Sequence, residues 1–318
     1  MFLQKAFTYQ NQFWKYLVGS LIIIIASTIG QFPLMLAVMM KLSSQGKNML
    51  EMNETTLMTV LDKNLTLFLM LFSFLVAFLG LILVLRFLHR QNLKDITTTR
   101  TKVDWKRIFF AFGLWAVFQV IVTIVNYYVS PEDFTWNFQL QPFLILLVVA
   151  MIMIPIQTSV EEYVFRGYLM QGFGLLSKNK WFPLLLTSLI FGGLHFFNPE
   201  VVKMGPIVMI YYIGTGLFLG IITLMDEGLE LALGFHAANN LITALLVTSE
   251  WSAFQTHSVL KDVSNPSAGF EVVLPVFIIF PLLLFVFAKK YGWINWKEKL
   301  SGKLEEPSSN SIEFISND

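Results

Sequence analysis

Two things are scarce in this sequence: cysteine and charge. The 318 residues include no cysteine, which excludes disulfides, thiol catalysis and Cys-ligated zinc or iron–sulfur centres. Charged residues make up only 14%, whereas soluble domains carry about 25%. The net charge is +1, so no basic field attracts nucleic acid. We therefore expect no nucleic-acid partner.

What replaces charge is apolar sequence. Hydrophobic residues make up 55% of the chain, and the mean hydropathy is +0.64. A helix needs about 20 apolar residues to cross a bilayer. We therefore predict an all-α polytopic membrane protein with about eight transmembrane helices, at residues 17–40, 64–88, 108–129, 142–176, 181–197, 206–225, 231–247 and 271–288.

The positive charges predict the orientation of the chain. With the basic loop at residues 86–107 inside, sixteen Lys and Arg lie on the cytoplasmic side and five lie outside, with Arg166 in the membrane. Cytoplasmic loops carry the excess of Lys and Arg, so we predict that both termini are cytoplasmic. The compact, cysteine-free chain favours a bacterial plasma membrane as its location.

Three polar clusters interrupt the apolar runs: Glu161, Glu162 and Arg166 in "SVEEYVFRGYL"; His195 in "FGGLHFF"; and His236, Asn239 and Asn240 in "GFHAANN". An ionisable side chain at membrane depth costs at least about 2.5–3.5 kcal/mol, and usually faces a protein interior or a wet cavity. Glu162 with Arg166, and His236 with Asn240, are four residues apart and so share a helix face.

Each cluster also has a purely structural interpretation. A Glu–Arg pair can staple helices, a histidine can pack against a hydrogen-bond partner, and an asparagine can join two helices. Three clusters within about 80 residues instead favour one site. Adjacent carboxylates beside an arginine are expected to differ in charge state, which acid–base chemistry requires. Gly192 and Gly193 beside His195 are expected to allow close helix packing.

These motifs, taken in order, resemble a known family. Glu161-Glu162-x-x-x-Arg166, Phe191-x-x-x-His195 and His236-x-x-x-Asn240 match the EExxxR, FxxxH and HxxxN/D pattern of the CAAX protease and bacteriocin-processing (CPBP/Abi) family, which includes type II CAAX prenyl endopeptidases. The resemblance covers about residues 142–250. It implies an intramembrane endopeptidase that acts on a peptide or a membrane protein.

The resemblance also implies a role for each residue. Glu161 would activate water, Glu162 and Arg166 would support it, and His195 would act with it. His236 and Asn240 would polarise the scissile carbonyl. No HExxH helix is present, so the commonest zinc-protease spacing is missing. A His₂Glu zinc site remains possible, so no cofactor is certain.

Four regions follow from this interpretation. Residues 1–140 form an N-terminal three-helix membrane region, 141–250 the catalytic core, 251–300 the last transmembrane helix and its flanks, and 301–318 a disordered tail. The alternatives are a non-enzymatic membrane scaffold or immunity protein, and a proton-coupled transporter. The sequence shows no internal repeat, which counts against a transporter.

Two of the polar clusters would lie at different distances from the cytoplasmic ends of their helices. On a straight helix Glu162 lies roughly 24 Å from Lys178, whereas His236 lies only about 8 Å from the start of its own helix. We therefore expect a helix break near Gly172–Gly174, with residues 175–181 along the membrane interface. The site would then be reached from the cytoplasmic half.

Overall fold

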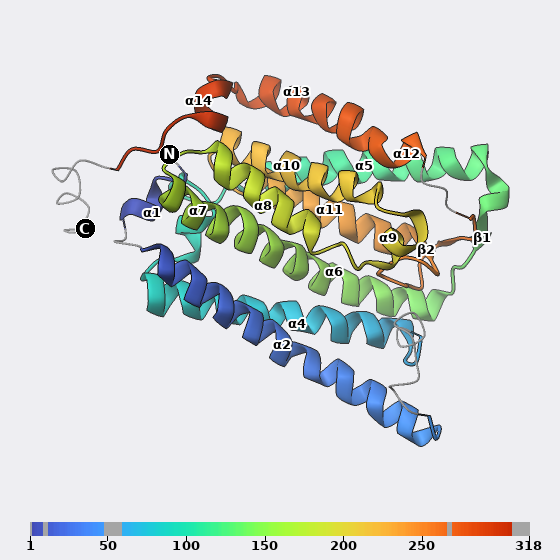
Figure 1. Ribbon diagram of the computed structural model, residues 1–318. Coiled ribbons are helices and arrows are strands. Elements are labelled where there is room, and N and C mark those ends of the chain that lie inside the picture. Colours follow the sequence, from blue (N-terminus) through green and yellow to red (C-terminus); the bar gives the residue numbers. More distant parts are fainter. Residues whose placement is uncertain (1, 9–11, 48–58, 266–268, 307–318) are drawn as a thin grey trace.

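The structure is a computed structural model that describes residues 2–8, 12–47, 59–265 and 269–306 (Figure 1). Long helices run roughly alongside one another, and the two ends of the bundle differ. One end holds residues 2–8 and 296–306 and is called here the terminal end. The other holds a small β-sheet and is called the sheet end.

The expected all-helical membrane protein is confirmed. In the described part of the chain, six helical segments are long and apolar enough to cross a membrane: Phe13–Ser44, Lys63–His89, Trp105–Val129, Leu140–Ser177, Val208–Asp226 and Val272–Tyr291. The other two expected spans are shorter helices, α8 (Trp181–Gly193, 13 residues) and α11 (Glu230–Leu246, 17 residues). The described residues thus contain six spans by length and composition, and the predicted count of eight is not confirmed.

The remaining elements complete the bundle. The helices include α1 (Lys5–Thr8), α2 (Phe13–Ser44), α4 (Lys63–Leu83), η2 (Val84–His89), η3 (Leu93–Ile96), α5 (Trp105–Val129), η4 (Pro131–Asp133), α6 (Leu140–Glu162), η5 (Tyr163–Leu169), α7 (Met170–Ser177), α9 (Pro199–Met204), α10 (Val208–Asp226), α12 (Phe270–Leu274), η6 (Pro275–Ile279), α13 (Phe280–Tyr291) and α14 (Trp296–Ser301). The strands β1 (Phe134–Trp136), β2 (Val247–Ser249) and β3 (Leu260–Asp262) form a sheet in which β3 pairs antiparallel with β1 and parallel with β2.

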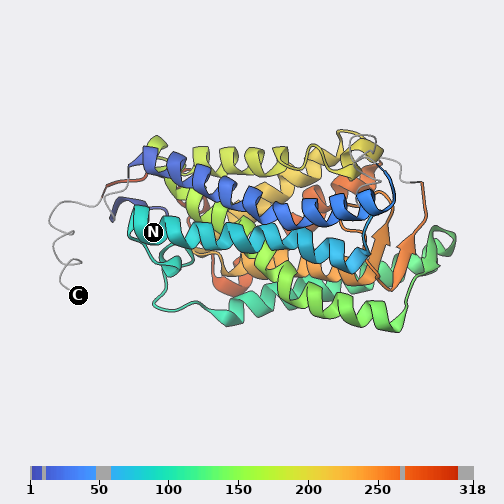
Figure 2. The same ribbon diagram turned by 90° about the horizontal axis from the view of Figure 1, so that it is seen from below.

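Small residues set the closest helix contacts. Figures 1 and 2 show α2 and α4 side by side along one edge of the bundle. A Cβ added at Gly30 would lie 2.6 Å from the Cα of Ser73, and one at Gly80 would lie 2.7 Å from the Cβ of Ala26. Close approach of this kind is how membrane helices gain packing energy without a hydrophobic driving force between them.

The terminal end is covered by segments that are distant in sequence. Phe2, Leu3, Ile96 and Leu304 share one buried cluster, each at most 3% exposed. The N–H of Leu229 donates to the Thr97 carbonyl at 2.7 Å. The first and last described residues and the basic loop therefore lie at the same end of the bundle. Which side of the membrane that end faces stays a prediction.

The expected disordered tail is wrong for its first residues. Ser301 ends α14, the side chain of Leu304 is buried, and Lys303 forms an isolated bridge with Asn179. These contacts fix residues 301–306 against the bundle. Residues 307–318 lie outside the described residues.

The expected helix break is also wrong. The chain is helical from Leu140 to Ser177 and reverses only at Lys178, where φ is +52°. Gly172 and Gly174 serve packing instead, because a Cβ at Gly172 would lie 2.7 Å from the Tyr16 ring and one at Gly174 would lie 3.1 Å from Leu304.

The depth mismatch is resolved in another way. Thr97 bonds to the Tyr163 hydroxyl through its own hydroxyl and to Leu229 through its carbonyl. The turn between α10 and α11 therefore lies level with η5. From Gly167 to Ser177 the helix extends roughly 15 Å beyond that level. The buried cluster at the terminal end, which includes Phe2, Leu3 and Leu304, packs around this extension.

Candidate active site

The first half of the site is a buried ion pair where α6 passes into η5. Arg166 Nη1 donates to Glu162 Oε1 at 2.9 Å, and both side chains are 0% exposed. Arg166 Nη2 donates to the Gly216 carbonyl on α10 at 3.1 Å, and the guanidinium lies 4.3 Å from the centre of the Phe191 ring. The expected pairing of Glu162 with Arg166 is therefore present. A single π-helical turn, common at functional sites, positions it.

His236 on α11 bridges the two glutamates. Its Nδ1 lies 2.7 Å from Glu162 Oε1, and its Nε2 lies 3.4 Å from Glu161 Oε2. An N–H on either ring nitrogen therefore faces a carboxylate acceptor. The two carboxylates differ in access: Glu161 is 15% exposed and Glu162 is fully buried.

A chain of side-chain amides extends the network away from Glu161. Gln157 Nε2 donates to Glu161 Oε1 at 2.6 Å, and Asn240 Nδ2 donates to Gln157 Oε1 at 3.1 Å. Asn239 Nδ2 donates to Asn240 Oδ1 at 3.1 Å, and Trp115 Nε1 on α5 donates to Asn239 Oδ1 at 3.0 Å. Polar groups of α5, α6 and α11 are thereby fixed relative to one another.

Sequence reasoning missed Gln157 and Trp115. Gln157 carried a signal, since it is polar in an apolar run and lies four residues before Glu161, on the same helix face. Trp115 carried none, because its role depends on how α5 packs beside α11.

His195 forms the second half of the site, just after the end of α8. Its Nδ1 lies 2.8 Å from the Phe191 carbonyl oxygen. A carbonyl can only accept, so Nδ1 carries the proton and Nε2 of the neutral ring holds a lone pair. Tyr212 stacks on the imidazole with ring centres 4.3 Å apart.

The Phe191 ring lies between the two halves. Its centre is 4.8 Å from the His195 ring and 6.0 Å from the His236 ring. The structure therefore joins Glu161, Glu162, His236 and Asn240 in one network, with His195 one aromatic ring away. Their joint action at one site stays a prediction.

Close packing of α8 on α10 sets this spacing. A Cβ added at Gly192 would lie 3.0 Å from backbone atoms of Ile213, whereas one at Gly193 would meet nothing within 4 Å. The expectation of close backbone approach thus holds for Gly192 and is wrong for Gly193.

A metal does not fit the site residues as they stand. In the described part of the chain, no three His, Asp or Glu side chains are grouped so that they could hold a metal ion. His195 and His236 turn to different partners on either side of Phe191, so the possible His₂Glu zinc set is not assembled.

A further carboxylate lies near His195. Glu200 on α9 accepts the N–H of Ala253 at 2.7 Å through Oε1. Burial raises the pKa of Glu200 above its usual range, while the Ala253 hydrogen bond and the nearby His195 act in the opposite direction. Sequence reasoning missed it because Glu200 follows an apparent helix end and reads as a loop residue.

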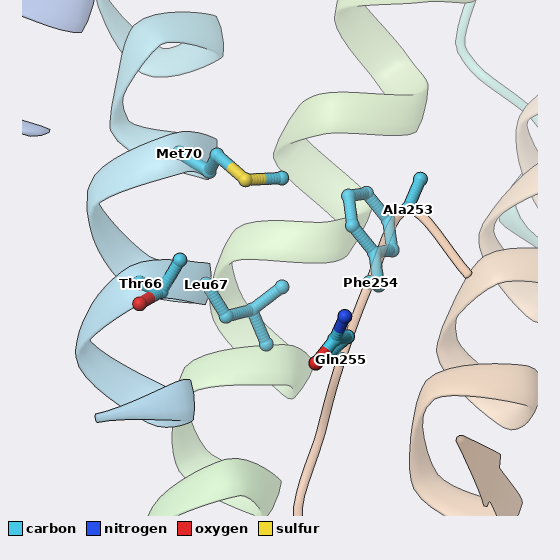
Figure 3. Close-up of a pocket in the computed structure, with 6 residues that line it drawn as sticks. All are labelled: Thr66, Leu67, Met70, Ala253, Phe254 and Gln255. Atoms are coloured by element: carbon cyan, nitrogen blue, oxygen red, sulfur yellow. The ribbon is translucent and has the colours of Figure 1, made fainter. Parts of the chain in front are cut away.

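A small pocket near the sheet end is separate from these residues. It lies between α4 and the segment that carries Phe254 and Gln255 (Figure 3). Its volume is about 10 Å³, room for about one water molecule. None of the residues of the candidate site lines it.

Comparison with known proteins places the site within a recognised region. The family model described as type II CAAX prenyl endopeptidase Rce1-like matches residues 139–242, which contain every predicted site residue. A model of the bovine immunodeficiency virus surface protein (SU) matches residues 4–134, which contain none. The uncharacterized protein YyaK of Bacillus subtilis (strain 168) is 30% identical over 290 residues, which are 91% of this chain and 94% of YyaK. No solved structure matches.

Proposed function

The chain belongs to the type II CAAX prenyl endopeptidase Rce1-like family, and from that premise we propose that it is an intramembrane endopeptidase that uses a glutamate-activated water. The substrate class is a membrane-associated protein or peptide. Family membership supports the endopeptidase class. The glutamate mechanism rests on the geometry of this chain.

The difference in access between the two glutamates carries the mechanism. Glu162 is fully buried, and its Oε1 receives both Arg166 and His236. Glu161 keeps partial exposure, and Gln157 and His236 orient its two oxygens. Only Glu161 combines a fixed orientation with access to water, so it is the base and Glu162 is its positioning residue.

The reaction then follows from the groups around Glu161. Glu161 takes a proton from water, the resulting hydroxide attacks the scissile carbonyl carbon, and that proton passes to the departing amine. Asn240 uses one amide hydrogen on Gln157 and has a second for the developing oxyanion. His195 Nε2, opposite the Nδ1 bound to Phe191, serves as a second proton carrier.

The test is Glu161→Gln, which keeps the shape and removes the basic oxygen. General-base catalysis contributes about 10²–10⁴-fold, so cleavage should fall by that factor while the protein still folds and inserts. New protein N-termini in cells with the wild type are compared with those in cells with Glu161→Gln. Glu132→Gln, an exposed carboxylate at the sheet end, is the control.

Two outcomes would redirect the assignment. Identical N-termini in wild type and Glu161→Gln would favour the scaffold or immunity role over the protease. Purified wild type should also keep its activity in a metal chelator, because its described residues form no group of metal ligands. Loss of activity in chelator, restored by zinc, would make the glutamates and histidines metal ligands.

A further inference from the structure

We propose that Glu200 forms a subsite that binds the cationic side chain of a lysine or arginine in the peptide substrate. This inference rests on the proposed function, because it names the substrate class of that site. Neither the motifs nor the matched family description assigns a role to Glu200.

The first observation is an incompletely used carboxylate. Glu200 Oε1 is held by the Ala253 N–H, but Oε2 is buried and has no hydrogen-bond partner among the described residues. Other buried carboxylates of this chain face arginine: Glu162 pairs with Arg166, and Asp226 and Glu230 both pair with Arg100. Among the described residues Glu200 has no such counter-charge, and a substrate cation would supply one.

The second observation is the position of Glu200 beside the reacting groups. Asn198 Nδ2 donates to the Tyr212 hydroxyl at 3.3 Å, and Tyr212 stacks on His195. Asn198 is also the residue that precedes α9, and Glu200 lies in the first turn of that helix. An extended peptide advances about 3.3–3.6 Å per residue, so the recognised basic residue lies within a few residues of the scissile bond.

The lysines near Glu200 do not pair with it in the described structure. On the segment that carries Ala253, the charge of Glu250 is balanced by Lys261 at 2.7 Å. Lys203 lies in the last turn of α9 and Glu200 in its first turn, and the two form no ion pair in the described structure. Burial disfavours the ionised form of Glu200, and a neighbouring cation would favour it.

One variant distinguishes substrate recognition by Glu200 from a purely structural role of this residue. Glu200 could serve only to fasten α9 to the segment at Ala253. Glu200→Gln keeps a carbonyl oxygen for the Ala253 N–H and removes only the charge. A fastening role predicts no change in substrate preference, whereas a recognition role predicts its loss.

The experiment uses two sets of fluorescein-labelled alanine–leucine decapeptides. In one set a lysine is moved one position at a time, and in the other norleucine, which lacks the ammonium, replaces it. Binding anisotropy and cleavage are measured for the full-length wild type, Glu200→Gln and Glu200→Lys. Glu250→Gln removes an exposed carboxylate from the same end and is the matched control.

We expect the wild type and Glu250→Gln to bind at least one lysine peptide about tenfold or more tighter than its norleucine partner. Glu200→Gln should lose that preference, and Glu200→Lys should bind the norleucine peptide more tightly than its lysine partner. Equal affinities in the wild type, or an unchanged preference in Glu200→Gln, would overturn the proposal. Lysine preference in binding without cleavage would keep the subsite and reject the protease. Cleavage without lysine preference would keep the protease and reject the subsite.

Discussion

At the scale of single residues, Arg166 shows how a charge is kept inside this bundle. It is the largest fully buried side chain of the described residues. A carboxylate, a backbone carbonyl and an aromatic face surround its guanidinium. Removing one partner of such a pair leaves the other charge buried and unpaired, which typically costs more than the pair itself contributes.

Arg166→Ala should therefore lower the free energy of unfolding by about 3–5 kcal/mol. The double variant Arg166→Met, Glu162→Leu should recover much of that loss without recovering activity, because no charge is left unpaired. Thermal melts in detergent measure both. Arg86→Ala, at an exposed position, is the control, and a single variant as stable as that control would contradict the buried-pair account.

Glu200 gives a prediction about pH. Its pKa is raised by burial, so the stabilisation from its protonated form is present at low pH and is lost as the pH rises through the folded-state pKa. Glu200→Gln does not titrate. The variant should melt higher than the wild type at pH 8, and the difference should shrink as the pH falls below the ordinary glutamate range. A variant less stable than the wild type at pH 8 would show that the ionised carboxylate is paired.

The sequence was sufficient for the residues that cost most in lipid. Glu161, Glu162, Arg166, His195, His236 and Asn240 stand out because polar groups in apolar runs require a reason, and their catalytic roles stay a prediction. Their partners were harder to find. The Gly216 carbonyl and the Trp115 indole are unremarkable in sequence, and they become partners only through the packing of α10 and α5.

At the scale of elements, the contact between α8 and α10 determines the distance between the two halves of the site. Gly192 and Gly216 allow the two helices to approach closely, because a Cβ at Gly216 would lie 3.0 Å from the backbone of Ser188. The double glycine in "FGGLH" predicted such a contact. It could not show which of the two residues faces the neighbouring helix, because that depends on helix rotation.

The adjacent glycines provide a matched test. Gly192→Ala should force α8 away from Ile213, destabilise the protein by about 1–3 kcal/mol, and reduce cleavage by displacing His195. Gly193→Ala enters open space and should leave both stability and cleavage near wild type. Melting temperatures and cleavage rates of the two variants are compared directly. Equal behaviour would mean that this helix contact does not position the histidine.

Helix continuity was predicted less well than helix location. The proposed break at Gly172–Gly174 assumed that the cytoplasmic ends of all helices lie at one level. In the structure, α7 extends past the turn between α10 and α11, and that turn is covered by the Leu93–Thr98 segment. A difference in level between helix ends arises from long-range packing and leaves no local signal in the sequence.

At the scale of the whole molecule, the charge distribution makes a prediction about orientation. The terminal end carries the basic loop, and Arg100 and Arg107 in that loop pair with Asp226. Reporter fusions after residue 306 and after residue 134 should report opposite sides of the membrane, with the first one cytoplasmic. An external signal from the fusion after residue 306 would reverse the orientation of the whole bundle.

The buried position of Phe2 and Leu3 has a consequence for biosynthesis. The Phe2 amide donates to Glu227, and the Leu3 side chain packs in the same cluster as Leu304. At about 5–20 residues per second, a ribosome needs on the order of ten to forty seconds to reach residue 227 after residue 2. The segment that carries Phe2 and Leu3 therefore docks only after the segments that carry Glu227 and Leu304 have been made, and its docking is a late step in the assembly of the bundle.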